Sequence, residues 1–77
     1  MIRAHIRATH PPAFGLPVET IDLEVVLQEG FADTPEAAHA RILRQIQEGG
    51  NVVIPVEGEP AVIYSSDVLE VLGVWDG

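Results

Sequence analysis

Cysteine and lysine are both absent from this sequence of 77 residues. Without cysteine, the chain forms no disulfide, offers no thiolate nucleophile and builds no thiolate zinc site. Long apolar runs are missing too. None approaches the roughly 20 residues that a membrane-spanning helix needs, and the N-terminal MIRAHIRATH lacks the apolar core of a signal peptide. We therefore expect a cytoplasmic protein that does not enter a membrane.

Positive charge is scarce. Twelve Asp and Glu residues stand against four Arg, which gives a formal net charge of -8. A nucleic-acid-binding protein needs a basic surface to displace counterions, and an anionic membrane repels an acidic protein. The composition thus argues against direct binding to nucleic acids or to membranes.

The short chain limits the size of the core. We expect one domain, residues 1–77, yet 47% of the residues are hydrophobic, which is generous for this length. The surplus predicts that a second copy or a partner covers one apolar face. We therefore expect a homo-oligomer, most simply a dimer, and a clean monomer in light scattering at high micromolar concentration would contradict this.

The firmest local signal is an amphipathic helix in the segment TPEAAHARILRQIQE. Thr34 is a suitable N-cap, and Pro35 occupies the first helical position, where a missing N–H costs nothing. Gly49 and Gly50 supply the left-handed backbone that ends a helix. The apolar positions that share one helical face are Ala38, Ile42, Leu43 and Ile46.

A β-hairpin is predicted directly after this helix. Residues 51–56 (NVVIPV) and 61–64 (AVIY) are rich in β-branched residues, and EGEP between them makes a four-residue loop. Pro55 lacks a main-chain donor, so its strand should lie at an edge or contain a bulge there.

Two further strands are predicted before the helix. Residues 2–8 alternate apolar and polar residues, and so do residues 21–28. Antiparallel pairing would set the basic residues of the first strand against Asp22 and Glu24, which helps to define the register. A helix over residues 20–29 is the alternative. Residues 9–17 contain three prolines and a glycine, which exclude regular structure.

The C-terminal segment allows two interpretations. Ser65 or Ser66 can cap a short helix, or Ser-Ser-Asp can turn the chain into a fifth strand in which Leu69, Val71 and Trp75 share a face. The β-branched content favours the strand. The sequence therefore predicts an α+β fold, ββαββ with a C-terminal strand or short helix, and one helix packed on a small antiparallel sheet.

No pattern in the chain indicates catalysis, a cofactor or a metal. His5, His10 and His39 lack the spacing of metal ligands, and Ser65-Ser66 has no glycine-flanked elbow. The GGN segment after the helix stands in the wrong order for a phosphate-binding loop, and Glu57-Gly58-Glu59 has too few oxygen ligands for a calcium loop. We expect structural roles for these residues and no enzymatic activity.

Four residues are candidates for a protein interface. Phe14 and Leu16 lie on the proline-rich loop, where they either anchor a partner or fold back over the sheet edge. Trp75 lies two residues from the C-terminus, where chains usually fray unless they pack against something. Tyr64, at the end of the predicted hairpin, completes this set.

The segments TPEAAHARILRQIQEGG and NVVIPVEGEPAVIYSSDVLEV, within residues 33–71, resemble small uncharacterised accessory proteins encoded by phages of GC-rich actinobacteria. The resemblance implies a short cytoplasmic product that acts by binding a host protein. It assigns no functional residue and does not include residues 9–17.

Three functions from different classes remain. The favoured one is a non-catalytic binding module that modulates a host protein through an apolar surface or a strand edge. An acidic nucleic-acid mimic that blocks a DNA-handling protein is the second, and a small enzyme with His5 or His39 beside a carboxylate in a cleft between protomers is the third. The mimic requires one continuous acidic face formed by Glu19, Asp22, Glu24, Glu57, Glu59, Asp67 and Glu70.

Overall fold

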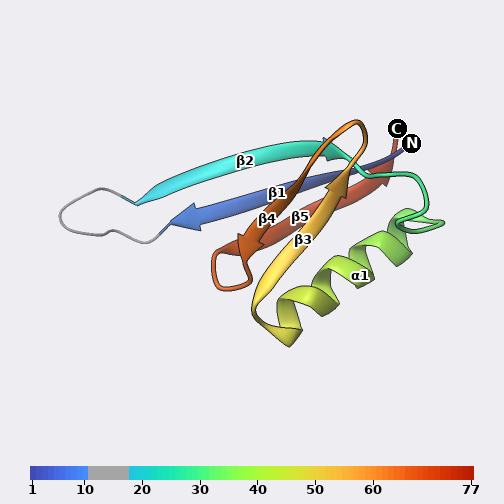
Figure 1. Ribbon diagram of the computed structural model, residues 1–77. Coiled ribbons are helices and arrows are strands. Elements are labelled where there is room, and N and C mark those ends of the chain that lie inside the picture. Colours follow the sequence, from blue (N-terminus) through green and yellow to red (C-terminus); the bar gives the residue numbers. More distant parts are fainter. Residues whose placement is uncertain (11–17) are drawn as a thin grey trace.

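A three-stranded antiparallel sheet forms the base of the structure (Figure 1). The computed structural model describes residues 1–10 and 18–77. Strand β1 (Ile2–His10) lies in the middle, between β2 (Glu19–Val26) and β5 (Leu69–Asp76). The predicted pairing of the first two strands is confirmed, and the residues predicted as either strand or helix form β2.

The alternation along β1 separates an apolar face from a charged face. Ala4, Ile6 and Ala8 are buried, whereas Arg3 and Arg7 are half-buried on the opposite face of the sheet. Successive side chains of a strand point to opposite faces, so the apolar side chains of β1 all lie on the same face. The rest of the chain covers this apolar face.

Helix α1 (Pro35–Glu48) has the predicted ends. The Thr34 hydroxyl accepts a hydrogen bond from the Ala37 N–H (3.1 Å), and Gly49 follows the last helical residue with a φ of 82°. Ala38 and Ile42 are the buried residues of this helix and lie on its inner side. The expectation for Leu43 was wrong: 39% of this residue is exposed, because its position on the helix turns it away from the sheet.

Strands β3 (Asn51–Val56) and β4 (Glu59–Ser65) form the predicted hairpin, but with a tighter turn. Only Glu57 and Gly58 lie between the strands, and Gly58 adopts a φ of 71°, which favours glycine. The register shifts between Ile54 and Val56, so Pro55 lies at an irregularity in a two-stranded sheet. This agrees with the prediction from proline's lack of a main-chain N–H donor.

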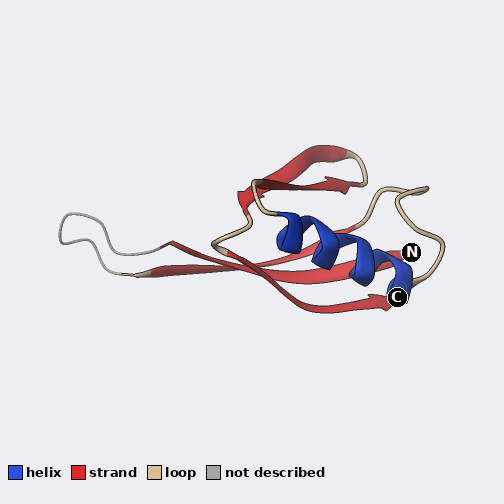
Figure 2. Cartoon of the chain, turned by 90° about the horizontal axis from the view of Figure 1, so that it is seen from below, coloured by secondary structure: helices blue, strands red, loops and turns tan. Residues whose placement is uncertain are grey.

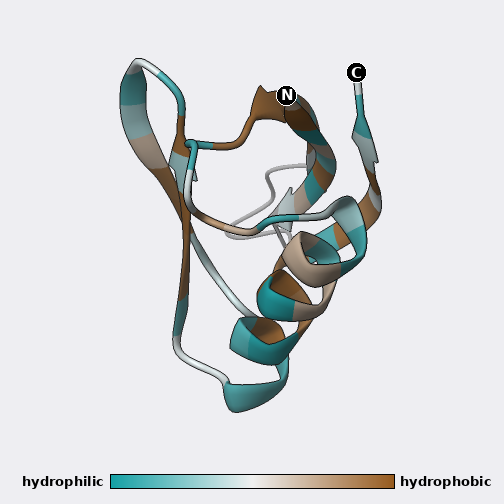
Figure 3. Ribbon diagram, turned by 90° about the vertical axis from the view of Figure 1, so that its right-hand side faces the viewer, coloured by the Kyte–Doolittle hydropathy of each residue, from teal (hydrophilic) through white to brown (hydrophobic). Residues whose placement is uncertain are grey.

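The hairpin and the helix together cover the apolar face of the base sheet. Helix α1 packs against β5 and β3, which places β3 between α1 and β4 in the covering layer (Figure 2). Figure 3 shows the hairpin on one side, the base sheet on the other, and α1 closing the space between them. The largest fully buried side chains come from all three parts: Ile6, Ile42, Ile54 and Val52.

Main-chain contacts tie the hairpin to the end of β2. Leu27 and Val56 form an isolated bridge, and the Glu57 N–H donates to the Val26 carbonyl oxygen (2.9 Å). The fold is thus α+β, ββαββ with a C-terminal strand, as predicted. Its five strands belong to two separate antiparallel sheets.

The C-terminal segment forms a strand, as its composition favoured, but the predicted common face of its apolar residues was wrong. Leu69 is buried and Val71 packs against the core, whereas Trp75 lies opposite Arg3 on the charged face of the sheet. The register against β1 shifts at His5, where Leu72 is an extra residue, and such a bulge reverses the alternation. Within residues 1–10 and 18–77, no helix is long and apolar enough to cross a membrane.

Candidate protein-interaction surface

The two edges of the β3–β4 hairpin differ. On the β3 side, the Gln45 side chain of α1 donates to the Val53 carbonyl oxygen (3.2 Å) and accepts a hydrogen bond from the Val53 N–H (3.0 Å). This amide therefore takes the place of a neighbouring strand and closes the β3 edge.

The same geometry shows where the main chain of β4 points. In an antiparallel pair, residues that exchange main-chain hydrogen bonds alternate with residues whose groups point away from each other. Val53 bonds to Gln45 rather than to β4, so its partner Ile63 also directs its N–H and carbonyl groups outward. In the described part of the chain, no hydrogen bond reaches these groups of Ile63.

Apolar side chains accompany this open main chain. Val53 and Ile63 face each other across the hairpin on its outer side and are 42% and 58% exposed. Between Glu59 and Asp67 the chain carries no charge. We call the main chain of residues 61–65, with the exposed side chains of Val53 and Ile63, the β4 edge.

The β4 edge lacks the protection that most exposed strands carry. Edge strands are commonly shielded by charges, proline, bulges or a covering element. Strand β2 has this protection, because Asp22 and Glu24 lie along it and its Val26 carbonyl accepts the Glu57 N–H. Pro60 lies at the start of β4 and leaves Ala61 to Ser65 without such a residue. The β4 edge therefore lacks the protection that β2 has against pairing with another chain.

Beneath the β4 edge, the base sheet continues beyond the covering layer. The arm formed by β1 and β2 extends past β4 in both ribbon views (Figures 1 and 2). Leu23 and Val25 of β2, like Val62 and Tyr64 of β4, are only partly buried against the core. A strand added beside β4 would therefore also cover apolar surface on this arm.

The charged face of the base sheet holds an ion-pair network. Arg7 donates to both carboxylate oxygens of Asp22 (2.8 and 3.4 Å), and Arg3 lies 3.8 Å from Glu24. The hydrogen bonds from Arg7 lower the pKa of Asp22, and the bond to Asp22 raises the pKa of Arg7. The cross-strand charge pairing that the sequence predicted is thus confirmed, on a face open to solvent.

Stability should therefore decline in acid through Asp22. A carboxyl group whose pKa is lowered on folding stabilises the fold above its ordinary value, 3.8, and loses this contribution as the pH falls through its folded-state pKa. We expect Asp22→Asn to lower the urea unfolding midpoint at pH 7 and to have a much smaller effect near pH 3. Glu48→Gln, on α1, is the matched control, and an equal effect of Asp22→Asn at both pH values would contradict this.

Of the predicted interface residues, the two that the structure describes lie apart. Tyr64 lies on the inner side of β4, partly buried against the core, while Trp75 lies on the opposite face of the base sheet and is 37% exposed. Phe14 and Leu16 fall outside the described residues. Tyr64 and Trp75 therefore do not share one surface.

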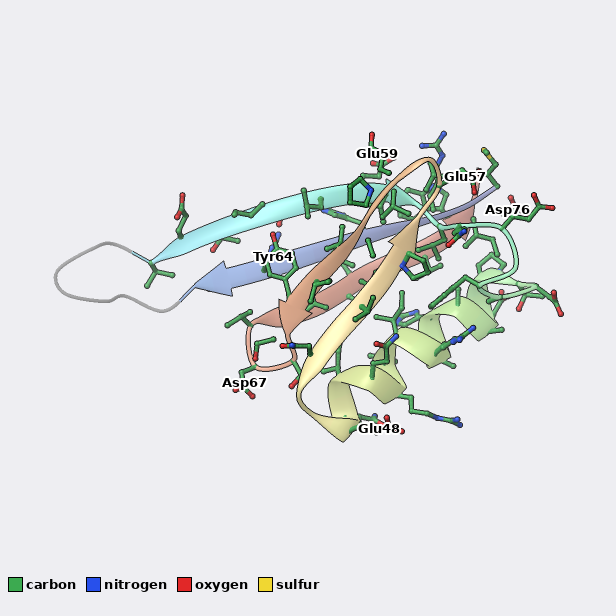
Figure 4. All side chains as sticks on the ribbon, in the orientation of Figure 1. Glu48, Glu57, Glu59, Tyr64, Asp67 and Asp76 are labelled. Carbon is green, nitrogen blue, oxygen red and sulfur yellow. The ribbon has the colours of Figure 1, made fainter. Side chains whose placement is uncertain are left out.

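The predicted acidic residues occupy several regions. Glu57 and Glu59 lie at the hairpin turn, and Asp67 lies at the other end of β4 (Figure 4). Glu19 lies at the start of β2. Three others alternate with arginines on the charged face of the base sheet: Asp22, Glu24 and Glu70. This distribution does not provide the continuous acidic face that a nucleic-acid mimic requires.

The histidines offer little support for an enzyme. His5 Nε2 lies 3.9 Å from a carboxylate oxygen of Asp22, but both side chains are half-exposed on the open sheet face rather than in a cleft. His39 is half-buried on α1. Among the described residues, no group of three or more His, Asp or Glu side chains is placed to hold a metal ion.

Sequence reasoning missed the exposed side chains of the β4 edge, Val53 and Ile63, and the role of Gln45 in closing the β3 edge. A usable signal was present, because the two strands are apolar without interruption although a hairpin in a covering layer buries only one face. If Val52 and Tyr64 face the core, strict alternation along the two strands places Val53 and Ile63 on the outer face. The role of Gln45 had no such signal, since it depends on where the helix meets β3.

No protein-family model matches the chain, and comparisons with curated proteins and with solved structures give no match. The resemblance to phage accessory proteins stays a prediction. Function is therefore inferred from the geometry of the described residues.

Proposed function

We propose that this protein is a non-catalytic binding module that recognises a partner protein by strand addition at the β4 edge. The observation that carries the proposal is the contrast within one hairpin. Gln45 closes the β3 edge, whereas Ile63 directs outward main-chain groups that no described residue pairs. The resemblance of residues 33–71 to phage accessory proteins makes a host protein the expected partner.

Strand addition suits this surface for physical reasons. An added strand gains main-chain hydrogen bonds, and alternate side chains supply specificity. Ile63 would lose contact with water at the same time, which adds a hydrophobic contribution. Neither the mimic nor the enzyme has a comparable supporting observation. Self-association, possible through another surface, stays a prediction.

The proposal predicts that Ile63→Pro weakens partner binding roughly tenfold or more. Proline removes the outward N–H and obstructs a neighbouring strand, yet it spares the β3–β4 ladder, to which the Ile63 N–H does not contribute. The measurement is capture of partners by tagged protein from a lysate of a GC-rich bacterial host. Washes at high salt and mass spectrometry identify a stoichiometric partner.

Two controls separate loss of the main-chain N–H from loss of apolar contact and from unfolding. Ile63→Thr keeps the N–H and removes apolar bulk, so its loss of binding should be smaller than that of Ile63→Pro. Circular dichroism checks that each variant is folded. Retention of the partner by Ile63→Pro at the wild-type level would rule out strand addition at β4.

A further inference from the structure

The charge on β3, β4 and β5 is of one sign. Residues 45–77, which include β3, β4 and β5, contain no Lys, Arg or His. The arginines lie elsewhere: Arg3 and Arg7 on the charged face of the base sheet, Arg41 and Arg44 on α1. The acidic residues in this segment are Glu48, Glu57, Glu59, Asp67, Glu70 and Asp76. A chain that approaches the hairpin therefore meets carboxylates and no nearby cation on its strands.

Two carboxylates mark the ends of β4. Glu59 is its first residue and Asp67 follows its last by two positions, and Figure 4 shows them at opposite ends of the strand with Tyr64 between. The six extended residue steps from Glu59 to Ser65 span about 20 Å, and Ser66 and Asp67 then turn the chain towards β5. The stretch between the two carboxylates is uncharged and contains Ile63 at its centre.

Each end also adjoins a shallow depression. One, of about 440 Å³, is lined by residues that include Glu59 and Pro60. The other, of about 500 Å³, is lined by residues that include Asp67 and Glu70. Both depressions can accept a long side chain with a terminal positive charge.

We propose that the segment that adds to β4 is an extended peptide with a β-branched, apolar centre and a Lys or Arg at each end, about six to eight positions apart. This inference rests on the proposed function and specifies its partner. The apolar centre packs against Ile63, and the two cations reach the carboxylates of Glu59 and Asp67. Charge complementarity at the rim then selects the partner and speeds its association.

A second copy of this chain is a poor occupant of the same edge. Antiparallel self-pairing centred on Ile63 would set Glu59 opposite Asp67 of the other copy. No shifted register within residues 45–77 brings a cation opposite these carboxylates, because this segment contains none. Like charges placed opposite each other destabilise a strand pair. The acidic ends therefore disfavour self-pairing and favour a basic partner.

Three synthetic nine-residue peptides test the inference. They share an alternating Thr, Val and Ile centre and carry Lys, Gln or Glu at both ends. Titrated into ¹⁵N-labelled protein at low salt, the Lys-ended peptide should shift the amide signals of Ala61, Ile63 and Ser65. It should bind at least about fivefold more tightly than the Gln-ended peptide, and this advantage should shrink at 0.5 M salt.

Two double variants locate the charge effect. Glu59→Gln/Asp67→Asn should abolish the preference for the Lys-ended peptide. Glu36→Gln/Glu48→Gln makes the same change in net charge at the two ends of α1 and should leave the preference in place. An equal loss in both double variants would show a general effect of net charge and overturn the inference.

The remaining outcomes separate this inference from the proposed function. Equal binding of the Lys-ended and Gln-ended peptides at β4 would overturn the basic partner while strand addition stands. Absence of amide shifts at β4 with millimolar Lys-ended peptide would also overturn it, and the capture experiment with Ile63→Pro would still decide the proposed function. Concentration-dependent self-pairing at Ile63 without peptide would contradict the inference directly.

Discussion

Ile42→Ala is expected to lower the free energy of unfolding by about 2–5 kcal/mol. Ile42 is fully buried beneath α1, so its truncation removes apolar contacts and leaves a cavity between the helix and the sheet. A domain of this size has a total stability of the order of 4–12 kcal/mol. A loss of this size would lower the urea unfolding midpoint, measured by circular dichroism, and with a total stability at the lower end of the range it would leave a substantial fraction unfolded at 25 °C.

Leu43→Ala is the matched control for this prediction. Leu43 is the next residue on the same helix but is partly exposed, so its truncation should cost less than about 1 kcal/mol. Comparable losses for the two variants would mean that α1 does not present Ile42 to the core as the structure places it. The position of α1 on the sheet also matters for binding, because Gln45 of this helix closes the β3 edge.

Ala38→Leu should be the second most damaging of the substitutions considered, with a loss of about 1–3 kcal/mol. Ala38 is fully buried where α1 approaches the sheet, and a larger side chain there must displace the helix or adopt a strained conformation. Thermal unfolding monitored by circular dichroism would show a reduced midpoint temperature.

The exposed residue Ala40 provides the comparison for Ala38. Ala40→Leu makes the same substitution on the solvent side of α1 and should change the stability by no more than about 0.5 kcal/mol. If Ala38→Leu left the midpoint unchanged, the close approach of helix and sheet at this position would be refuted.

Local signals in the sequence were sufficient for most of the secondary structure. Thr34, Pro35 and Gly49 defined α1 because capping and glycine conformation depend only on neighbouring residues. The alternation in residues 2–8 and 21–28 predicted β1 and β2, and complementary charges predicted that they pair. The face of Trp75 was wrong, because the bulge that reverses it depends on pairing with β1 rather than on β5 itself.

The sequence by itself thus determined an acidic α+β domain with a capped helix and a hairpin, since these follow from composition and from short-range preferences. Only the tertiary structure decided that the strands divide into two sheets and that α1 closes one edge of the hairpin through Gln45. It also left the β4 edge exposed, with a carboxylate at each end. Which edge of the hairpin is closed depends on where α1 packs against it. The spacing of residues along the chain does not predict that contact.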